Sequence, residues 1–223
     1  MKQALAERDA RLSSYRFEAK TQQGAEQATH AFFFRSPNRL RAHLQTPVEL
    51  QWSFDGQRLF KLAGAQQTHT TLELKLPKDQ AAVFLNATFS PFVREGFRTP
   101  LMPSKGVSAT RVTHPRASDA VELKVEPGEG VTVTYVLRLP SADFLERRMR
   151  SPSAQGRLEV LEEHCDTALK LCVPRKLAEA VDGAALLTVE LTALALNEAL
   201  AAEDFTLPVP EGWVADVRQV VEQ

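Results

Sequence analysis

Residues 31–62, AFFFRSPNRLRAHLQTPVELQWSFDGQRLFKL, decide the fold. Apolar and polar residues alternate in RLRAHL and again in LQWSF, which is the period of a half-buried strand. Pro37-Asn38 ends the first apolar run, and Asp55-Gly56 between alternating runs is a strong hairpin signal. The stretch therefore predicts consecutive antiparallel strands with one apolar face, and this face covers either a closed core or a ligand.

The same alternation continues through most of the chain. We also expect a helix over residues 1–12 and a second over Pro77–Ala87. Residues 141–150 are either a capped helical turn, which we favour, or the end of a hairpin. The pattern predicts an α+β protein with one domain over residues 1–223, whose long antiparallel sheet curls into an open barrel around a helix and a lid. The further strands are expected at 13–22, 27–34, 70–76, 107–113, 120–126, 131–139, 157–163, 169–181 and 185–196.

Residues 89–103, FSPFVREGFRTPLMP, combine three prolines and a glycine with large apolar side chains. The prolines prevent a long regular element, yet the segment is too apolar for a solvated loop. It must pack on something. It is either a fixed lid over one end of the core or a movable lid over an apolar cavity, in which Met102 is an adaptable wall.

Composition describes an ordinary soluble globular chain. Its 223 residues are 43% hydrophobic and 25% charged, with a net charge of −1. A near-neutral balance gives no reason to expect nucleic-acid binding, and no apolar run approaches the length of a membrane span. Residues 1–12 lack the apolar core of a leader peptide, so the protein is either cytosolic or begins after a removed leader.

Signs of catalysis or of metal binding are weak. The chain has no GxSxG, P-loop, GxGxxG or HExxH motif, and its five histidines are scattered, so we expect neither an enzyme nor a cofactor. Cys165 and Cys172 are either two ordinary thiols or, if a hairpin turns between them, a disulfide. His164 and Asp166 flank Cys165, but zinc sites need a second ligand cluster, and none is present.

Three short motifs, in order along the chain, resemble the LolA/LolB-like family of periplasmic lipoprotein carriers. FRSPN at 34–38 is similar to that family's Arg-Pro-Asn strand end, and WSFDGQ at 52–57 followed by Leu59-Phe60 is similar to its Asp-Gly hairpin. DFTLPVPEG at 204–212 is similar to its closing motif. The resemblance implies an incomplete, strongly curved antiparallel barrel, half open, with helices and a loop in its mouth as a lid.

The resemblance also implies a function. It predicts a monomeric carrier that binds acyl chains of lipoproteins or lipids in an apolar cavity and moves them through the periplasm toward the outer membrane. Donor and acceptor proteins at the membranes would be its partners, and the protein would be free or lipid-anchored after loss of a leader. One departure concerns the arginine that the family places directly before Pro-Asn and ties to lid closure. That position is Ser36 here, with Arg35 one place earlier.

Two alternatives remain open. One is a LolA-like sensor that detects lipids or lipoproteins and signals to a protein partner; the other is a structural protein whose barrel is filled by its own side chains. For the binding hypotheses, the apolar cavity and its lid are predicted to be formed by Leu40, Leu44, Leu50, Trp52, Phe54, Leu72, Leu74, Phe84, Phe89, Phe92, Phe97, Leu101, Met102, Val133, Tyr135 and Leu137.

Overall fold

The chain forms two compact units. Unit 1 contains Met1–Leu12, Gln22–Ala25 and Arg94–Glu190. Unit 2 contains Ser13–Thr21, Glu26–Val93 and Leu191–Gln223. The prediction of a single domain stays a prediction. The computed structural model describes residues 1–45, 49–74, 81, 84–85, 88–89, 94–98, 106–128 and 130–217.

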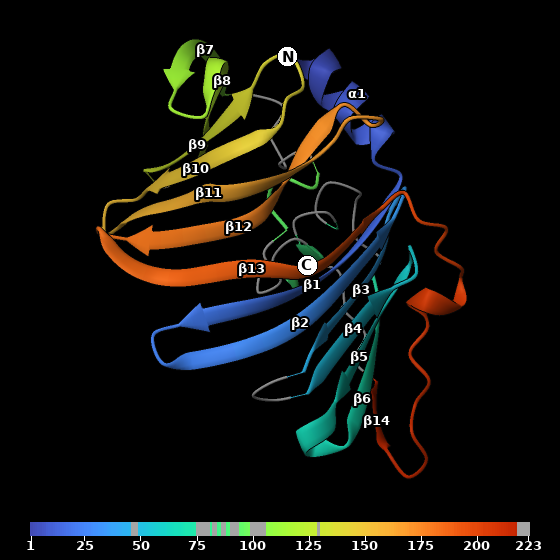
Figure 1. The fold of residues 1–223 in the computed structure, drawn as a ribbon. Coiled ribbons are helices and arrows are strands. Elements are labelled where there is room, and N and C mark those ends of the chain that lie inside the picture. The colour runs from blue at the N-terminus through green and yellow to red at the C-terminus, as the bar shows by residue number, and fades with distance from the viewer. Residues whose placement is uncertain are drawn as a thin grey trace. The chain divides into compact units, whose positions relative to one another are not determined.

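Unit 1 combines a helix with an antiparallel sheet. Its strands are hydrogen-bonded in the order β13-β12-β11-β10-β9-β8-β7, so sequence neighbours are also neighbours in space. Figure 1 shows β9 to β12 side by side, in yellow to orange. The elements are α1 (Lys2–Arg11), β7 (Val107–His114), β8 (Ala117–Gly128), β9 (Val131–Arg138), β10 (Phe144–Arg150), β11 (Gln155–Asp166), β12 (Leu171–Val181) and the first part of β13 (Ala184–Leu196).

Unit 2 is built on the order β14-β6-β5-β4-β3-β2-β1-β13. The ladders from β2 to β6 are antiparallel, and β14 pairs with β6 in parallel. β13 occurs in both orders because the division between the units falls inside it, after Glu190. The elements are β1 (Ser14–Gln23), β2 (Glu26–Arg35), β3 (Arg39–Leu44), β4 (Leu50–Phe54), β5 (Arg58–Ala63), the 3₁₀ turn η1 (Gly64–Gln66), β6 (Thr68–Glu73), the 3₁₀ turn η3 (Glu203–Phe205) and β14 (Val214–Val217).

The predicted α+β class with antiparallel strands and an N-terminal helix is confirmed. The helix predicted over 141–150 is wrong, because β10 pairs with both β9 and β11. Its charged residues find partners across the ladders: Glu146 lies 2.7 Å from Arg157, and Arg148 pairs with Glu122. These cross-strand contacts override the local helix propensity. The helix predicted over Pro77–Ala87 lies mostly outside the described residues.

Two arginines tie α1 to the loop that contains Gly96. Arg8 is 2% exposed and donates hydrogen bonds to the carbonyl oxygens of Gly96 and Phe97. In the opposite direction, Arg98 donates to the carbonyl oxygen of Asp9 near the end of the helix, which also accepts from the N–H of Leu12 at 3.3 Å. The loop and the helix therefore stabilise each other through charge-assisted hydrogen bonds.

Gly96 is a position where only glycine fits. Its φ is +88°, and a Cβ placed there would lie 2.6 Å from the ring of Pro174 and 3.1 Å from Cβ of Phe144. We expect Gly96→Ala to lower the free energy of unfolding by about 3 kcal/mol, because backbone strain and overpacking add. Urea denaturation followed by circular dichroism measures this loss.

Gly24→Ala is the matched control. Its φ is +58°, but no heavy atom lies within 4 Å of the added Cβ. It should therefore cost only about 1 kcal/mol, the strain of a positive φ without a clash. Equal losses in the two variants would show that the loop is not packed against β10 and β12.

Candidate functional site

Cross-strand register places three rows of side chains on one face of β3 to β6. Directly opposed residues of an antiparallel ladder share a face, so each row can be followed from strand to strand. We call these rows the β3–β6 face. In the strand order β3, β4, β5, β6 they are Leu40-Phe54-Leu59-Leu72, Ala42-Trp52-Lys61-Thr70 and Leu44-Leu50-Ala63-Thr68.

Stacked aromatic rings close this face on the side of β1 and β2. β2 continues the three rows with Phe34, Phe32 and His30. The ring centroids of Tyr15 and Phe34 lie 5.0 Å apart, and those of Phe17 and Phe32 lie 5.5 Å apart. The four rings are at most 5% exposed. This part of the sheet is therefore a filled core, not a binding surface.

Phe89, the first residue of the predicted lid, packs on the closed end. Its ring lies 5.9 Å from that of Phe32, edge to face, and the residue is fully buried. The preferred edge-to-face geometry stabilises this contact beyond simple burial. The start of the lid segment thus covers the aromatic end of the same face that carries the predicted cavity residues.

Part of the face is only half covered. Leu44, Leu50, Trp52 and Leu72 are half-buried, and Lys61 between them is exposed. Nζ of Lys61 lies 5.8 Å from the centre of the Trp52 ring. Adjacent apolar side chains with partly exposed surfaces gain free energy when an apolar ligand covers them. This part of the β3–β6 face is the candidate binding surface.

The opposite face of the same strands is covered by the C-terminal tail. Arg35 follows Phe34 in β2 and so points to the other side of the sheet. Its guanidinium lies 5.3 Å from the centre of the Phe205 ring and donates to the carbonyl oxygen of Leu200. Ser53 donates to the carbonyl oxygen of Phe205, which is 2% exposed. Arginine and serine donors thus hold the tail against this face.

The contact with the tail shows whether Arg35 can take the place of the lid-closing arginine. The resemblance places a lid-closing arginine at position 36, which is an exposed serine here. Arg35 does not replace it, because its side chain contacts the tail on the face opposite the β3–β6 face. Arg35 is therefore a structural residue of the tail contact.

Val133, Tyr135 and Leu137 share one face of β9 in unit 1. Arg147 stands opposite Tyr135 on β10 and forms an ion pair with Glu95. Burial raises the pKa of Tyr135, and the nearby Arg147 lowers it. The predicted residues do share a face, but an ion-paired arginine interrupts it. Their register partners on β8 are the buried Val125, Leu123 and Val121.

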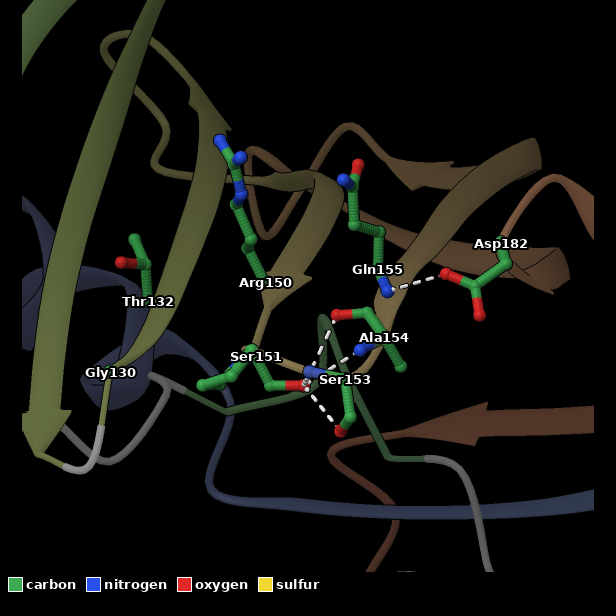
Figure 2. A pocket seen from close by; sticks show the side chains of 9 residues that line it. Gly130, Thr132, Arg150, Ser151, Ser153, Ala154, Gln155 and Asp182 are labelled. Carbon is green, nitrogen blue, oxygen red and sulfur yellow. Dashed lines mark hydrogen bonds between the residues drawn. The ribbon is translucent and has the colours of Figure 1, made fainter.

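A hollow of about 540 Å³ lies at the ends of β9 to β12 in unit 1. Figure 2 shows the turn that forms its floor, where Ser151 Oγ accepts a hydrogen bond from the N–H of Ala154 at 3.0 Å. The N–H of Gln155 donates to the carboxylate of Asp182 at 2.8 Å. Of the predicted cavity residues that the structure describes, none lines this hollow, and its polar walls do not suit an alkyl chain. Its lining residues are Gly130, Thr132, Arg150, Ser151, Pro152, Ser153, Ala154, Gln155 and Asp182.

Cys165 and Cys172 face each other across the β11–β12 hairpin and form a disulfide, with Cα atoms 4.0 Å apart. Among the described residues, no group of three or more His, Cys, Asp or Glu is placed to hold a metal ion. No helix in the described ranges is long and apolar enough to cross a membrane.

The predicted site residues are thus distributed between the units. Leu40, Leu44, Leu50, Trp52, Phe54 and Leu72 share the β3–β6 face. Leu74 follows β6 and Phe84 is helical and precedes the lid segment, both half-buried, while Phe97 is buried in unit 1. Phe92, Leu101 and Met102 lie outside the described residues. The grouping into one cavity stays a prediction.

Sequence reasoning missed Lys61 and the aromatic cluster around Phe32. Counting outward from a two-residue Asp55-Gly56 turn would have placed Leu59 opposite Trp52. The observed turn spans residues 55–58 and places Lys61 there instead. The triple Phe32-Phe33-Phe34 indicated apolar surroundings on both faces, but only the register shows that Phe32 and Phe34 join Tyr15 and not the tail. Which side chains share a face depends on pairing between segments that are distant in sequence.

The antiparallel order, the N-terminal helix and the partly covered apolar face define the LolA-like fold. A protein from Vibrio parahaemolyticus, described as an outer membrane lipoprotein-sorting protein domain, aligns with a TM-score of 0.56 and 10% identity, over 91% of this chain and 94% of its own. A LolA superfamily protein from Nitrosomonas europaea aligns with a TM-score of 0.52 and 12% identity, over 92% and 97%.

A DUF1329 family protein from Desulfovibrio piger is similar to the same extent. Its TM-score is 0.56 at 9% identity, over 92% of this chain and 96% of its own. No family model and no curated protein matches the sequence. The resemblance drawn from the three motifs is therefore confirmed at the level of the fold.

His30, in the row of Leu44 and Leu50, makes the stability of the folded protein depend on pH. It is 1% exposed, and its ring meets Phe17 edge to face at 6.2 Å. Burial lowers its pKa from 6.5 to about 4. Between these values the unfolded chain binds a proton at His30 and the folded chain does not. Its contribution to stability is therefore complete above pH 6.5 and declines as the pH falls toward 4.

We expect the unfolding free energy of the wild type to fall by about 2.5 kcal/mol from this cause between pH 7.5 and 4.5. His30→Gln removes the titrating group. The free energy of unfolding of this variant should therefore fall by about 2.5 kcal/mol less than that of the wild type over the same pH range. Urea denaturation of both proteins at the two pH values measures the difference. His43→Gln, which changes a histidine on the opposite face, is the control; parallel pH profiles for wild type and His30→Gln would contradict the assignment.

Proposed function

We propose that the protein is a carrier that binds acyl chains of lipoproteins or lipids on the β3–β6 face and transfers them toward the outer membrane. The observation that carries the proposal is the half-covered part of this face, where the register partners Leu44 and Leu50 lie beside the row of Trp52 and Lys61, and Leu72 lies in the row beyond. The LolA-like fold supports it, because one similar structure is described as a lipoprotein-sorting domain.

Acyl-chain binding needs an apolar wall and little else. Transfer of a chain from water gains roughly 0.8 kcal/mol per buried CH₂, so the four half-buried side chains and the adjoining lid would supply most of the affinity. Trp52 offers a wide flat surface with one polar edge. No bond is made or broken, and the proposal assigns the protein no catalytic step.

The Cys165–Cys172 disulfide supports a periplasmic location, because disulfides persist in oxidising compartments. We propose that the protein acts there as a monomer, takes cargo from one membrane-bound partner and delivers it to another. The lid segment that begins at Phe89 would control access to the bound chain.

The proposal predicts that the protein retains lipid on purification and that Trp52 reports binding. Native mass spectrometry of the purified protein should show bound lipid. In a Trp213→Phe background Trp52 is the remaining tryptophan, and a synthetic diacylated lipopeptide should shift its emission to shorter wavelength. Absence of bound lipid together with an unchanged spectrum would contradict the carrier function. A stable protein partner without lipid transfer between liposomes would favour the sensor hypothesis.

A pair of substitutions locates the site. Leu50→Gln should weaken lipopeptide binding roughly five- to tenfold, because about 1 kcal/mol of apolar contact is lost from a half-buried leucine. Leu161→Gln makes the same chemical change at a residue 39% exposed on β11 of unit 1 and should leave affinity unchanged. Equal effects of the two variants would place the ligand elsewhere.

A further inference from the structure

The β3–β6 face carries a single charged residue among its described side chains. The rows from β3 to β6 consist of apolar residues, Thr68, Thr70 and Lys61. Lys61 is exposed, and none of the ion pairs among the described residues involves it. The nearby carboxylates lie elsewhere: Asp55 is in the β4–β5 turn, and Glu49, before β4, contacts His43 on the opposite face. Glu73 of β6 follows Leu72 and stands opposite Arg58 in the register of that opposite face. An acyl ligand would therefore meet an uncompensated cation.

Register fixes where this cation stands. Lys61 opposes Trp52 on one side and Thr70 on the other, and its Nζ lies 5.8 Å from the indole centre. A cation over an aromatic face is held there by the ring quadrupole. Leu50 and Leu72 lie in the two neighbouring rows, so an alkyl chain can run along either row with its head at Nζ.

A ligand that covers this surface changes the surroundings of the cation. Apolar cover removes water from Lys61, which is unfavourable unless a charged or polar group replaces the water. An anionic head provides that replacement as a charge-assisted hydrogen bond, and the hydroxyl of Thr70 is a second donor beside it. A neutral head provides less, and a cationic head is repelled.

We propose that Lys61 selects amphiphiles with an anionic head, a carboxylate or a phosphate, whose alkyl chain lies on the β3–β6 face. This inference rests on the proposed function and specifies its ligand class. The head binds Lys61 Nζ beside the Trp52 ring, and the chain supplies most of the affinity. Free small anions lack the chain and do not bind appreciably.

The test compares oleate, oleyl alcohol and oleylamine at submicellar concentration and pH 8, by displacement of a fluorescent fatty acid from the delipidated protein. The wild type should bind oleate at least tenfold more tightly than oleyl alcohol, and oleylamine most weakly. Lys61→Met should abolish the preference while retaining binding of oleyl alcohol, and Lys61→Arg should keep it. Higher salt should reduce the preference in the wild type alone.

Lys20→Met is the matched control, because Lys20 is an exposed lysine of β1 in the same unit, on the face opposite the buried Tyr15, Phe17 and Ala19. It should behave as the wild type. Lysophosphatidylglycerol compared with lysophosphatidylcholine tests whether an anionic lipid phosphate is preferred over a zwitterionic head, as oleate tests a carboxylate. Acetate and inorganic phosphate test free anions, and displacement by either at millimolar concentration would overturn the proposal.

The outcomes separate the two claims. If neither oleate nor oleyl alcohol binds, the proposed function fails. If both bind with equal affinity, and Lys61→Met changes neither, the carrier function stands and the role of Lys61 is refuted. Circular dichroism and urea denaturation of each variant confirm that the compared proteins are folded.

Discussion

Cross-strand register is the constraint on which the candidate site depends. A shift of one residue in any ladder between β3 and β6 would turn every side chain of that strand to the other face. The β4–β5 turn holds the register with its own hydrogen bonds: the carboxylate of Asp55 accepts from the N–H groups of Gln57 at 2.9 Å and Arg58 at 2.8 Å. Gly56 supplies the positive φ, +109°, that the corner requires. A local turn thereby determines that Trp52 and Lys61 meet.

The two faces of the unit 2 sheet have different kinds of cover. One is closed by the chain itself, since Phe205 is buried and the carbonyl oxygens near it receive donors from Arg35, Arg41 and Ser53. These carbonyl oxygens are therefore satisfied within the protein. The other face is filled with aromatic rings near Phe32 and is only half covered near Trp52. The face that packs against the tail therefore contributes to stability, and the half-covered face remains accessible to a ligand.

Local patterns in the sequence predicted the strands, the N-terminal helix and the main hairpin, because period and turn residues act over a few positions. The prediction for 141–150 failed because its helix-forming residues are outweighed by partners on the adjacent strands β9 and β11 and, for Arg148, on β8. The role of Arg35 could not be predicted either, since the Phe205 ring that it contacts is distant in sequence. Alternation alone predicted half of the residues of the β3–β6 face. Placing Lys61 on this face also required the pairing of β4 with β5.

β13 has a consequence for how such a protein can change over evolutionary time. Its first residues complete the ladder with β12, and its last residues belong to the unit that contains β1. A recombination event between Glu190 and Leu191 would sever a hydrogen-bonded strand, so neither half can be grafted onto a foreign protein as a ready-made module. New specificities are therefore more accessible through point substitutions on existing faces than through exchange of whole segments.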